Sequence, residues 1–272
     1  MRSIREYHRP QQLEEALALL ARHDVTTLPI GGGTGLVAEG RLNVEAIVDL
    51  RDLGLSYIRR DGAALRLGAT TTLQTLIDSP ESAQAWSGEL ARVLELTVAR
   101  NLREAGTIAG TLVSATNNNP LAVLLLALDA SLTIEPGRKT VALEAFLSQR
   151  ASLLTASLIT EVTVPLPRPG QAVAFEKVGR TPADLPIVCA AIRAQLENGV
   201  LRDVRIGLGG VAPLPVRASR IEQALQGKPP DAHAVERARA DLNPPSDFLG
   251  SAEYRREVAA VLVRRAIERL MH

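Results

Sequence analysis

Apolar and polar positions alternate along this chain with two different periodicities, one typical of helices and one typical of strands. Apolar residues recur every three or four positions in the segments expected to form helices, which are 13–21, 71–76, 89–98, 121–128, 221–225 and 254–270. Short β-rich or alternating runs predict strands over 26–30, 46–50, 64–69, 158–164, 173–177, 187–196 and 205–209. Helices and strands do not alternate regularly, so the pattern predicts an α+β protein.

Turn residues divide this pattern into elements and domains. Asp61-Gly62 and Asn198-Gly199 each separate two strand-like runs and predict tight hairpins. Asn117–Asn119 forms a turn before Pro120, a residue suited to the first position of a helix. Proline clusters between residues 165 and 170 interrupt both helix and sheet, and they indicate a linker. We therefore expect an α+β region up to about residue 165, followed by a smaller domain of hairpins and helices.

Composition narrows the possible functions. The 31 basic and 30 acidic residues give a net charge of +1, and only 3% of residues are aromatic. Neither value favours binding to nucleic acid, which calls for a basic surface or aromatic stacking platforms. Cys189 is the only cysteine, so this chain can form no internal disulfide and no thiolate-bound iron–sulfur or zinc site. The N-terminus has no secretory pattern, and the longest apolar stretch is about half a membrane span, which predicts a soluble cytoplasmic protein without membrane insertion.

Two glycine-bearing segments are the candidates for ligand chemistry. Gly31-Gly32-Gly33-Thr34-Gly35 can turn successive backbone N–H groups toward one point, as phosphate-binding loops do. It lacks the lysine of a Walker A loop and the spacing and helix entry of the dinucleotide fingerprint, so a purely structural turn is an equal alternative. Gly106–Thr111 is either a packed crossing of two elements or the second half of a clamp for one extended ligand.

No other catalytic pattern is present. The sequence contains no G-x-S-x-G elbow and no H-E-x-x-H motif. A protein without an evident acid, base or nucleophile can still take part in catalysis when a cofactor supplies the chemistry.

The order of short motifs resembles the FAD-binding medium subunit of the xanthine dehydrogenase and carbon monoxide dehydrogenase family. Pro29–Leu36 resembles the first flavin loop of that family, and Leu102–Thr111 resembles its I-R-N-x-x-T-I-G-G-N motif. Phe175–Arg180 resembles the start of its second domain, and Gly209–Arg217 resembles its G-G-V-A-P-x-P-x-R signature. The resemblance covers nearly the whole chain.

This resemblance implies a vanillyl-alcohol-oxidase-like FAD-binding domain (PCMH type) over residues 1–167, with subdomains of about 1–54 and 55–167. A flavoprotein C-terminal domain would occupy residues 168–272. The implied function is electron transfer through FAD within a molybdenum hydroxylase. The partners would be an iron–sulfur small subunit and a molybdenum-cofactor large subunit, assembled as a dimer of heterotrimers. Electrons would pass from the iron–sulfur subunit to an external acceptor.

The resemblance also implies the residues that contact FAD, while it implies no catalytic residue and no metal ligand. The diphosphate would lie on residues 31–36 and on the turn 107–111, and Ile159 and Lys177 would lie near the flavin ring. The cofactor-binding candidates are Ile30, Gly31, Gly32, Gly33, Thr34, Gly35, Leu36, Thr107, Ala109, Gly110, Thr111, Ile159 and Lys177.

Three positions depart from the family pattern. Ala109 replaces a glycine, Thr111 replaces an asparagine, and Pro120 stands where the family often has a flavin-contacting aspartate. Asn118 or Asn119 would have to replace the hydrogen bonds of that aspartate. These departures favour one alternative, a scaffold subunit of the same complex that has lost FAD; a stand-alone flavin oxidoreductase of the same superfamily is another.

Overall fold

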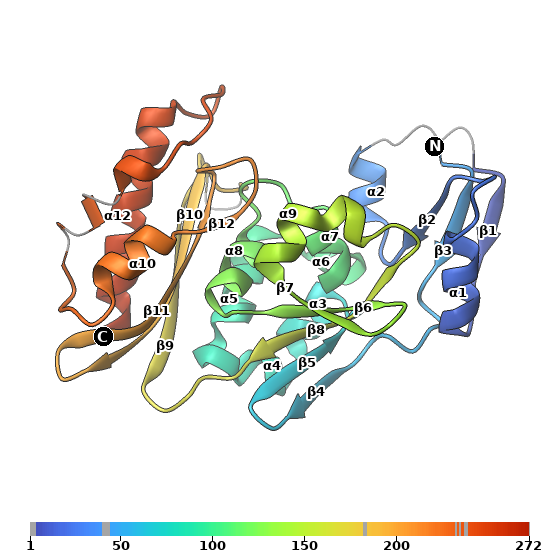
Figure 1. Ribbon diagram of the computed structural model, residues 1–272, viewed down its shortest axis with the longest axis horizontal. Helices are drawn as coiled ribbons and strands as arrows, with labels where there is room; N and C mark the ends of the chain where they lie inside the picture. Colours follow the sequence, from blue (N-terminus) through green and yellow to red (C-terminus); the bar gives the residue numbers. More distant parts are fainter. Residues whose placement is uncertain are drawn as a thin grey trace. The chain divides into compact units, whose positions relative to one another are not determined.

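The computed structural model describes residues 4–39, 44–181, 184–231, 233, 235–236 and 239–271 (Figure 1). The chain packs into two compact units, and neither is continuous in sequence. The first unit comprises Met1–Glu81, Ala99–Ser114 and Ser131–Val164; the second comprises Ser82–Val98, Ala115–Ala130 and Pro165–His272. The domain division at residue 167 follows chain order, whereas these units do not, and that division stays a prediction.

A small parallel sheet opens the first unit. Its strands lie in the order β1-β3-β2, with β1 at Glu6–His8, β3 at Ala46–Asp49 and β2 at Thr27–Ile30. All four residues of β3 are buried, because β3 is the central strand and α1 (Leu13–Leu20) covers the sheet. Ala16 of α1 is the fully buried contact of this helix and packs with Val48 and Leu50.

A five-stranded sheet forms the rest of the framework of the first unit, with the order β4-β5-β8-β6-β7. The predicted hairpin at Asp61-Gly62 is confirmed, since β4 pairs antiparallel with β5 across it and Gly62 has a φ of 56°. Thr72 caps the following helix by accepting a hydrogen bond from the Thr75 amide. The strands are β4 (Ile58–Asp61), β5 (Ala64–Gly68), β6 (Ser131–Glu135), β7 (Lys139–Ala142) and β8 (Leu158–Pro165). The helices are α2 (Thr34–Glu39), α3 (Leu73–Asp78), α6 (Arg100–Ala105), α7 (Ile108–Val113) and α9 (Leu143–Leu153).

The second unit is built on an antiparallel sheet with the order β12-β11-β10-β9. Residues 188–194 of β10 are buried on both faces of the strand, which requires cover on both sides of the sheet. In Figure 1, α10 and α12 lie on one side of this sheet, and α5 and α8 lie on the other. The strands are β9 (Gln171–Val178), β10 (Val188–Glu197), β11 (Val200–Gly209) and β12 (Val216–Arg217). The helices are η1 (Ala85–Gly88), α5 (Glu89–Thr97), α8 (Pro120–Ala127), α10 (Ser219–Leu225), η2 (Arg239–Asp241) and α12 (Ala252–Leu270), and α4 (Pro80–Gln84) precedes η1.

Helix α8 belongs to this second unit although it precedes the predicted linker. All eight of its residues are buried, because α8 lies between the sheet and α5. It approaches β11 at Gly207, where a Cβ atom would overlap the carbonyl oxygen of Val123. A glycine in the strand is therefore what lets the helix backbone pack directly on the sheet.

Candidate functional site

The first glycine segment is a tight connection between β2 and α2. Gly33 has a φ of 74°, a conformation that favours glycine, and α2 begins at the next residue. A Cβ atom on Gly32 would overlap the carbonyl oxygen of Ala105. A Cβ atom on Gly31 would lie 2.8 Å from the Thr107 hydroxyl. The missing side chains thus allow this loop to lie directly against the second glycine segment.

The expectation that the first loop has no helix entry is wrong, because α2 follows it at once. The second segment also differs from the predicted turn at 107–111, since Thr107 is the N-cap of α7. Its hydroxyl accepts a hydrogen bond from the Gly110 amide at 3.2 Å. Small and β-branched residues give α7 little intrinsic helix propensity, and the cap compensates for part of this at the first turn.

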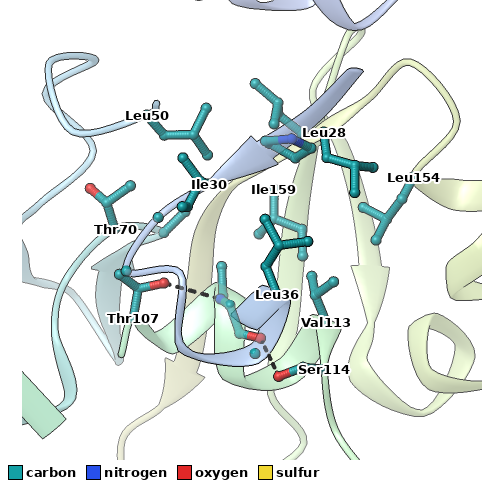
Figure 2. Close-up of a pocket in the computed structure, with 18 of the residues that line it drawn as sticks. Leu28, Ile30, Leu36, Leu50, Thr70, Thr107, Val113, Ser114, Leu154 and Ile159 are labelled. Carbon is teal, nitrogen blue, oxygen red and sulfur yellow. Dashed lines mark hydrogen bonds between the residues drawn. The ribbon is translucent and has the colours of Figure 1, made fainter. Parts of the chain in front are cut away.

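A cavity of about 460 Å³ opens beside the two glycine segments (Figure 2). Both main-chain groups of Gly110 make hydrogen bonds (Figure 2): its amide donates to the Thr107 hydroxyl, and its carbonyl accepts from the Ser114 hydroxyl at 2.9 Å. Leucine and isoleucine side chains from β2, α2, β8 and the end of α9 surround the space in the same view. The lining residues are Leu28–Leu36, Leu50, Ala69, Thr70, Thr107, Ala109, Gly110, Val113, Ser114, Arg150, Ala151, Leu154, Thr155 and Ser157–Ile159.

Eleven of the thirteen predicted cofactor-binding residues line this one cavity: Ile30–Leu36, Thr107, Ala109, Gly110 and Ile159. Thr111 does not line it, and its hydroxyl donates instead to the Thr107 carbonyl at 2.8 Å. Lys177 belongs to the second unit, where its ammonium group donates to the carbonyls of Leu96 at 3.0 Å and Asp184 at 3.2 Å. Burial lowers the pKa of Lys177 from its ordinary value of 10.5.

The asparagine run has a structural role within the second unit. Asn119 caps α8, its side-chain oxygen accepting from the Ala122 amide at 2.9 Å. The Asn118 amide group donates to the Pro186 carbonyl, and its oxygen accepts from Thr116. Pro120 occupies the first turn of α8. The amide oxygens proposed as substitutes for an aspartate are therefore engaged in a helix cap and a loop contact.

Sequence reasoning missed the wall contributed by α9 and the segment after it. Arg150, Ala151, Leu154 and Thr155 line the cavity, yet no element was predicted there. Leu143, Phe146 and Leu147 are spaced as the buried face of a helix, so the helical period would have revealed α9. Among the described lining residues, Arg150 is the only one with a charged side chain.

The sequence matches the family model described as "FAD binding domain in molybdopterin dehydrogenase" over residues 2–167. The chain belongs to this family of FAD-binding medium subunits. Residues 173–270 match a second model, "CO dehydrogenase flavoprotein C-terminal domain". The carbon monoxide dehydrogenase medium chain of Afipia carboxidovorans is 33% identical over 97% of this chain and 96% of that protein. The glyceraldehyde dehydrogenase medium chain of Sulfolobus acidocaldarius is 28% identical, with 96% of each chain covered.

Solved structures agree with this assignment. A Cu,Mo-containing CO dehydrogenase superimposes with a TM-score of 0.87 and 30% identity, covering 98% of this chain and 97% of that one. The quinoline 2-oxidoreductase of Pseudomonas putida 86 gives a TM-score of 0.88 at 27% identity, with 97% and 96% covered. The predicted fold class and family are confirmed. The chain is the FAD-carrying, electron-transferring subunit of a molybdenum hydroxylase, and it is thus an oxidoreductase subunit.

The cavity in the first unit fits such a cofactor. Its volume falls within the range of about 300–1,000 Å³ that is typical of small-molecule and cofactor sites. No carboxylate is found among the described residues that line it, so no acidic side chain among them repels a diphosphate. The glycine backbone of residues 31–35 lies on one side of the cavity and apolar side chains lie on the other, while the first N–H groups of α7 are already bonded within the protein.

The helices in the described part of the chain are too short or too polar to span a bilayer.

Proposed function

We propose that the cavity beside the two glycine segments is the FAD site. The diphosphate of FAD lies on the backbone of residues 31–36 and at the start of α7, and the flavin ring lies near Ile159. The observation that supports this most is the direct packing of two separate glycine segments at one cavity. The proposed contact of Lys177 with the flavin ring rests on the family resemblance alone.

The residues of the chain bind and orient the cofactor. Glycine positions 31–35 bring main-chain N–H groups close to the ligand, which a side chain would prevent. Leu28, Leu36 and Leu154 exclude water from the apolar part of the cavity. Bound FAD supplies the redox chemistry, and the described lining residues include no carboxylate or histidine that could act as an acid or base.

We further propose that the chain functions with an iron–sulfur subunit and a molybdenum-cofactor subunit. Electrons from the iron–sulfur subunit reach the flavin and leave to an external acceptor. The names of the relatives support a multi-subunit enzyme, since they include "medium chain" and "dehydrogenase complex subunit alpha". A dimer of heterotrimers and the division at residue 167 into an FAD-binding and a C-terminal domain belong to the same proposal. The cytoplasmic location stays a prediction.

Two neighbouring leucines at the end of α9 test the site. Leu154 lines the cavity and Leu153 does not, although both are half-buried. Leu154→Glu places a carboxylate in the apolar wall beside a diphosphate, and we expect FAD affinity to fall about a hundredfold. Leu153→Glu should bind FAD like the unmodified chain. Titration with FAD, followed by flavin fluorescence on folded protein, measures both.

Equal FAD affinity in both variants would contradict the proposed site. If the unmodified chain binds no FAD at high concentration but still co-purifies with its partner subunits, the FAD-less scaffold is the better description.

A further inference from the structure

We propose that Arg150 is a residue that determines the affinity of this subunit for FAD, its guanidinium group pairing with the diphosphate. The proposal rests on the FAD site proposed above and adds to it a charged contact that no sequence motif indicates. It assigns no step of electron transfer to Arg150, which acts by binding and positioning.

The location of Arg150 within the first unit supports this role. Arg150 lies in the last turn of α9 and is half-buried at the cavity wall. Its Nη1 atom donates to the carbonyl oxygen of Val113 at 3.1 Å, which holds the side chain against the end of α7. The next residue, Ser114, packs on the first glycine loop, where a Cβ atom on Gly35 would lie 2.9 Å from the Ser114 hydroxyl. The anchor of Arg150 at Val113 is thus one residue away from Ser114, which contacts the first glycine segment.

Charge explains why an arginine at this position matters. The glycine loop offers main-chain N–H groups, which carry only partial positive charge, and the first N–H groups of α7 are already bonded within the protein. A diphosphate carries full negative charge, and Arg150 is the only cation among the described lining residues. A guanidinium group has five N–H donors in a planar fork that matches phosphate oxygens, so it can hold the Val113 carbonyl and a ligand oxygen together.

The test compares three variants of the purified chain by FAD titration. We expect Arg150→Met to raise the Kd for FAD between about tenfold and a hundredfold, as loss of a charge-assisted hydrogen bond does. Arg150→Lys keeps the charge without the fork and should give an intermediate Kd. Arg100→Met is the matched control, because Arg100 is an exposed residue of α6 in the same unit that does not line the cavity; its Kd should be unchanged.

Salt dependence separates a charged contact from a structural one. Binding by the unmodified chain should weaken more steeply with ionic strength than binding by Arg150→Met, because salt screens the pair that the variant lacks. A Kd for Arg150→Met within twofold of that of the unmodified chain would overturn the proposal. So would equal, salt-independent losses in the Met and Lys variants together with a lower melting temperature of the FAD-free protein, since these would indicate that Arg150 only anchors α9.

The same titrations distinguish this proposal from the FAD site itself. If Leu154→Glu abolishes FAD binding while Arg150→Met does not weaken it, the site stands and the role of Arg150 is wrong. If neither variant changes FAD affinity, both proposals are wrong.

Discussion

The proposed FAD cavity of the first unit has almost no charged side chains, whereas the second unit has many ion pairs. The cavity wall is made of backbone, small residues and aliphatic side chains, with a single cation among its described residues. The second unit instead pairs carboxylates with arginines, some of them buried, such as Glu89 and Arg193, and some exposed, such as Asp129. Glu89 contacts Arg92 and Arg269, and Asp129 contacts Arg193, Arg205 and Arg217.

The difference reflects what each region has to do. A binding site needs main-chain groups that remain available to a ligand, so the chain removes side chains there. The second unit has to hold two short segments, Ser82–Val98 and Ala115–Ala130, against strands that come much later in sequence. Each segment contributes one carboxylate to these contacts. Glu89 accepts from the Phe175 amide of β9, and Asp129 accepts from arginines of β10, β11 and β12. Charge pairing thus connects segments that are distant in sequence, while glycine packing shapes the site.

The largest expected loss of stability follows from the substitution of Arg255, a buried arginine of α12 in the second unit. Arg255 is only 1% exposed and donates to the carbonyls of Ile187 and Gly210 and to both oxygens of Asp247. Arg255→Met removes the donor to the Ile187 and Gly210 carbonyls and the ion pair of Asp247, which the Leu249 amide still bonds, and we expect a loss of about 3–5 kcal/mol in the free energy of unfolding. Urea unfolding measures it, and exposed Arg265→Met on the same helix should change stability by no more than about 0.5 kcal/mol. A loss below about 1 kcal/mol for Arg255→Met would show that the network is not important for stability.

A smaller, pH-dependent effect is expected at Glu89. Burial would raise the pKa of Glu89, but the hydrogen bonds and charges of Arg92, together with the charge of Arg269 and the Phe175 amide, outweigh it and lower the pKa below its ordinary value of 4.5. The folded pKa is depressed, so the stabilisation is present above pH 4.5 and is lost as the pH falls through the folded pKa.

Glu89→Gln should therefore destabilise the protein by about 1.5–3 kcal/mol at about pH 7, since hydrogen bonds to a charged group are lost. The difference from the unmodified chain should shrink as the pH is lowered below 4.5. Thermal unfolding between about pH 3 and pH 8 checks both points, and a difference that stays constant with pH would contradict the role of the charge.

Substitution of Gly32 is expected to have the smallest effect on stability, but it should also weaken FAD binding directly. Gly32→Ala forces the loop away from Ala105, and we expect a cost of about 1–3 kcal/mol in stability, as for overpacking, together with weaker FAD binding. Gly62→Ala is the control: its Cβ atom meets nothing within 4 Å, so only backbone strain of about 1–2 kcal/mol applies and FAD affinity should be unchanged. Equal FAD affinity in both variants would show that the contact between the two glycine segments does not shape the site.

Much of the local structure could be predicted from the sequence, because its signals act over a few residues. Asp61-Gly62 and Asn198-Gly199 form the expected hairpins, and Asn198 and Gly199 both have positive φ, as such turns require. Pro120 begins α8, as its place after the asparagine turn predicts. The glycine segments were recognised as ligand-binding candidates because glycine sets backbone conformation by itself.

Other features depended on contacts that no local pattern encodes. Helix α2 follows the glycine loop and Thr107 begins α7, although both helices are six residues long and have weak helical patterns. Arg150 and Leu154 reach the cavity only because α9 packs against α7, β6 and β7. Lys177 matches a family motif, yet it lies in the second unit with backbone carbonyls as its partners.

The sequence by itself determined the fold class, the family, the positions of the tight turns and the two glycine segments, since each depends on residue identity and short spacing. Only the tertiary structure decided which segments share a unit and which residues line the cavity. The need for a glycine at 207 arises only because the backbone of α8 packs on β11 there. Asp129 forms ion pairs with arginines that lie at least 64 residues away in sequence. Close packing and charge neutralisation are properties of neighbours in space, and the order of residues along the chain does not reveal those neighbours.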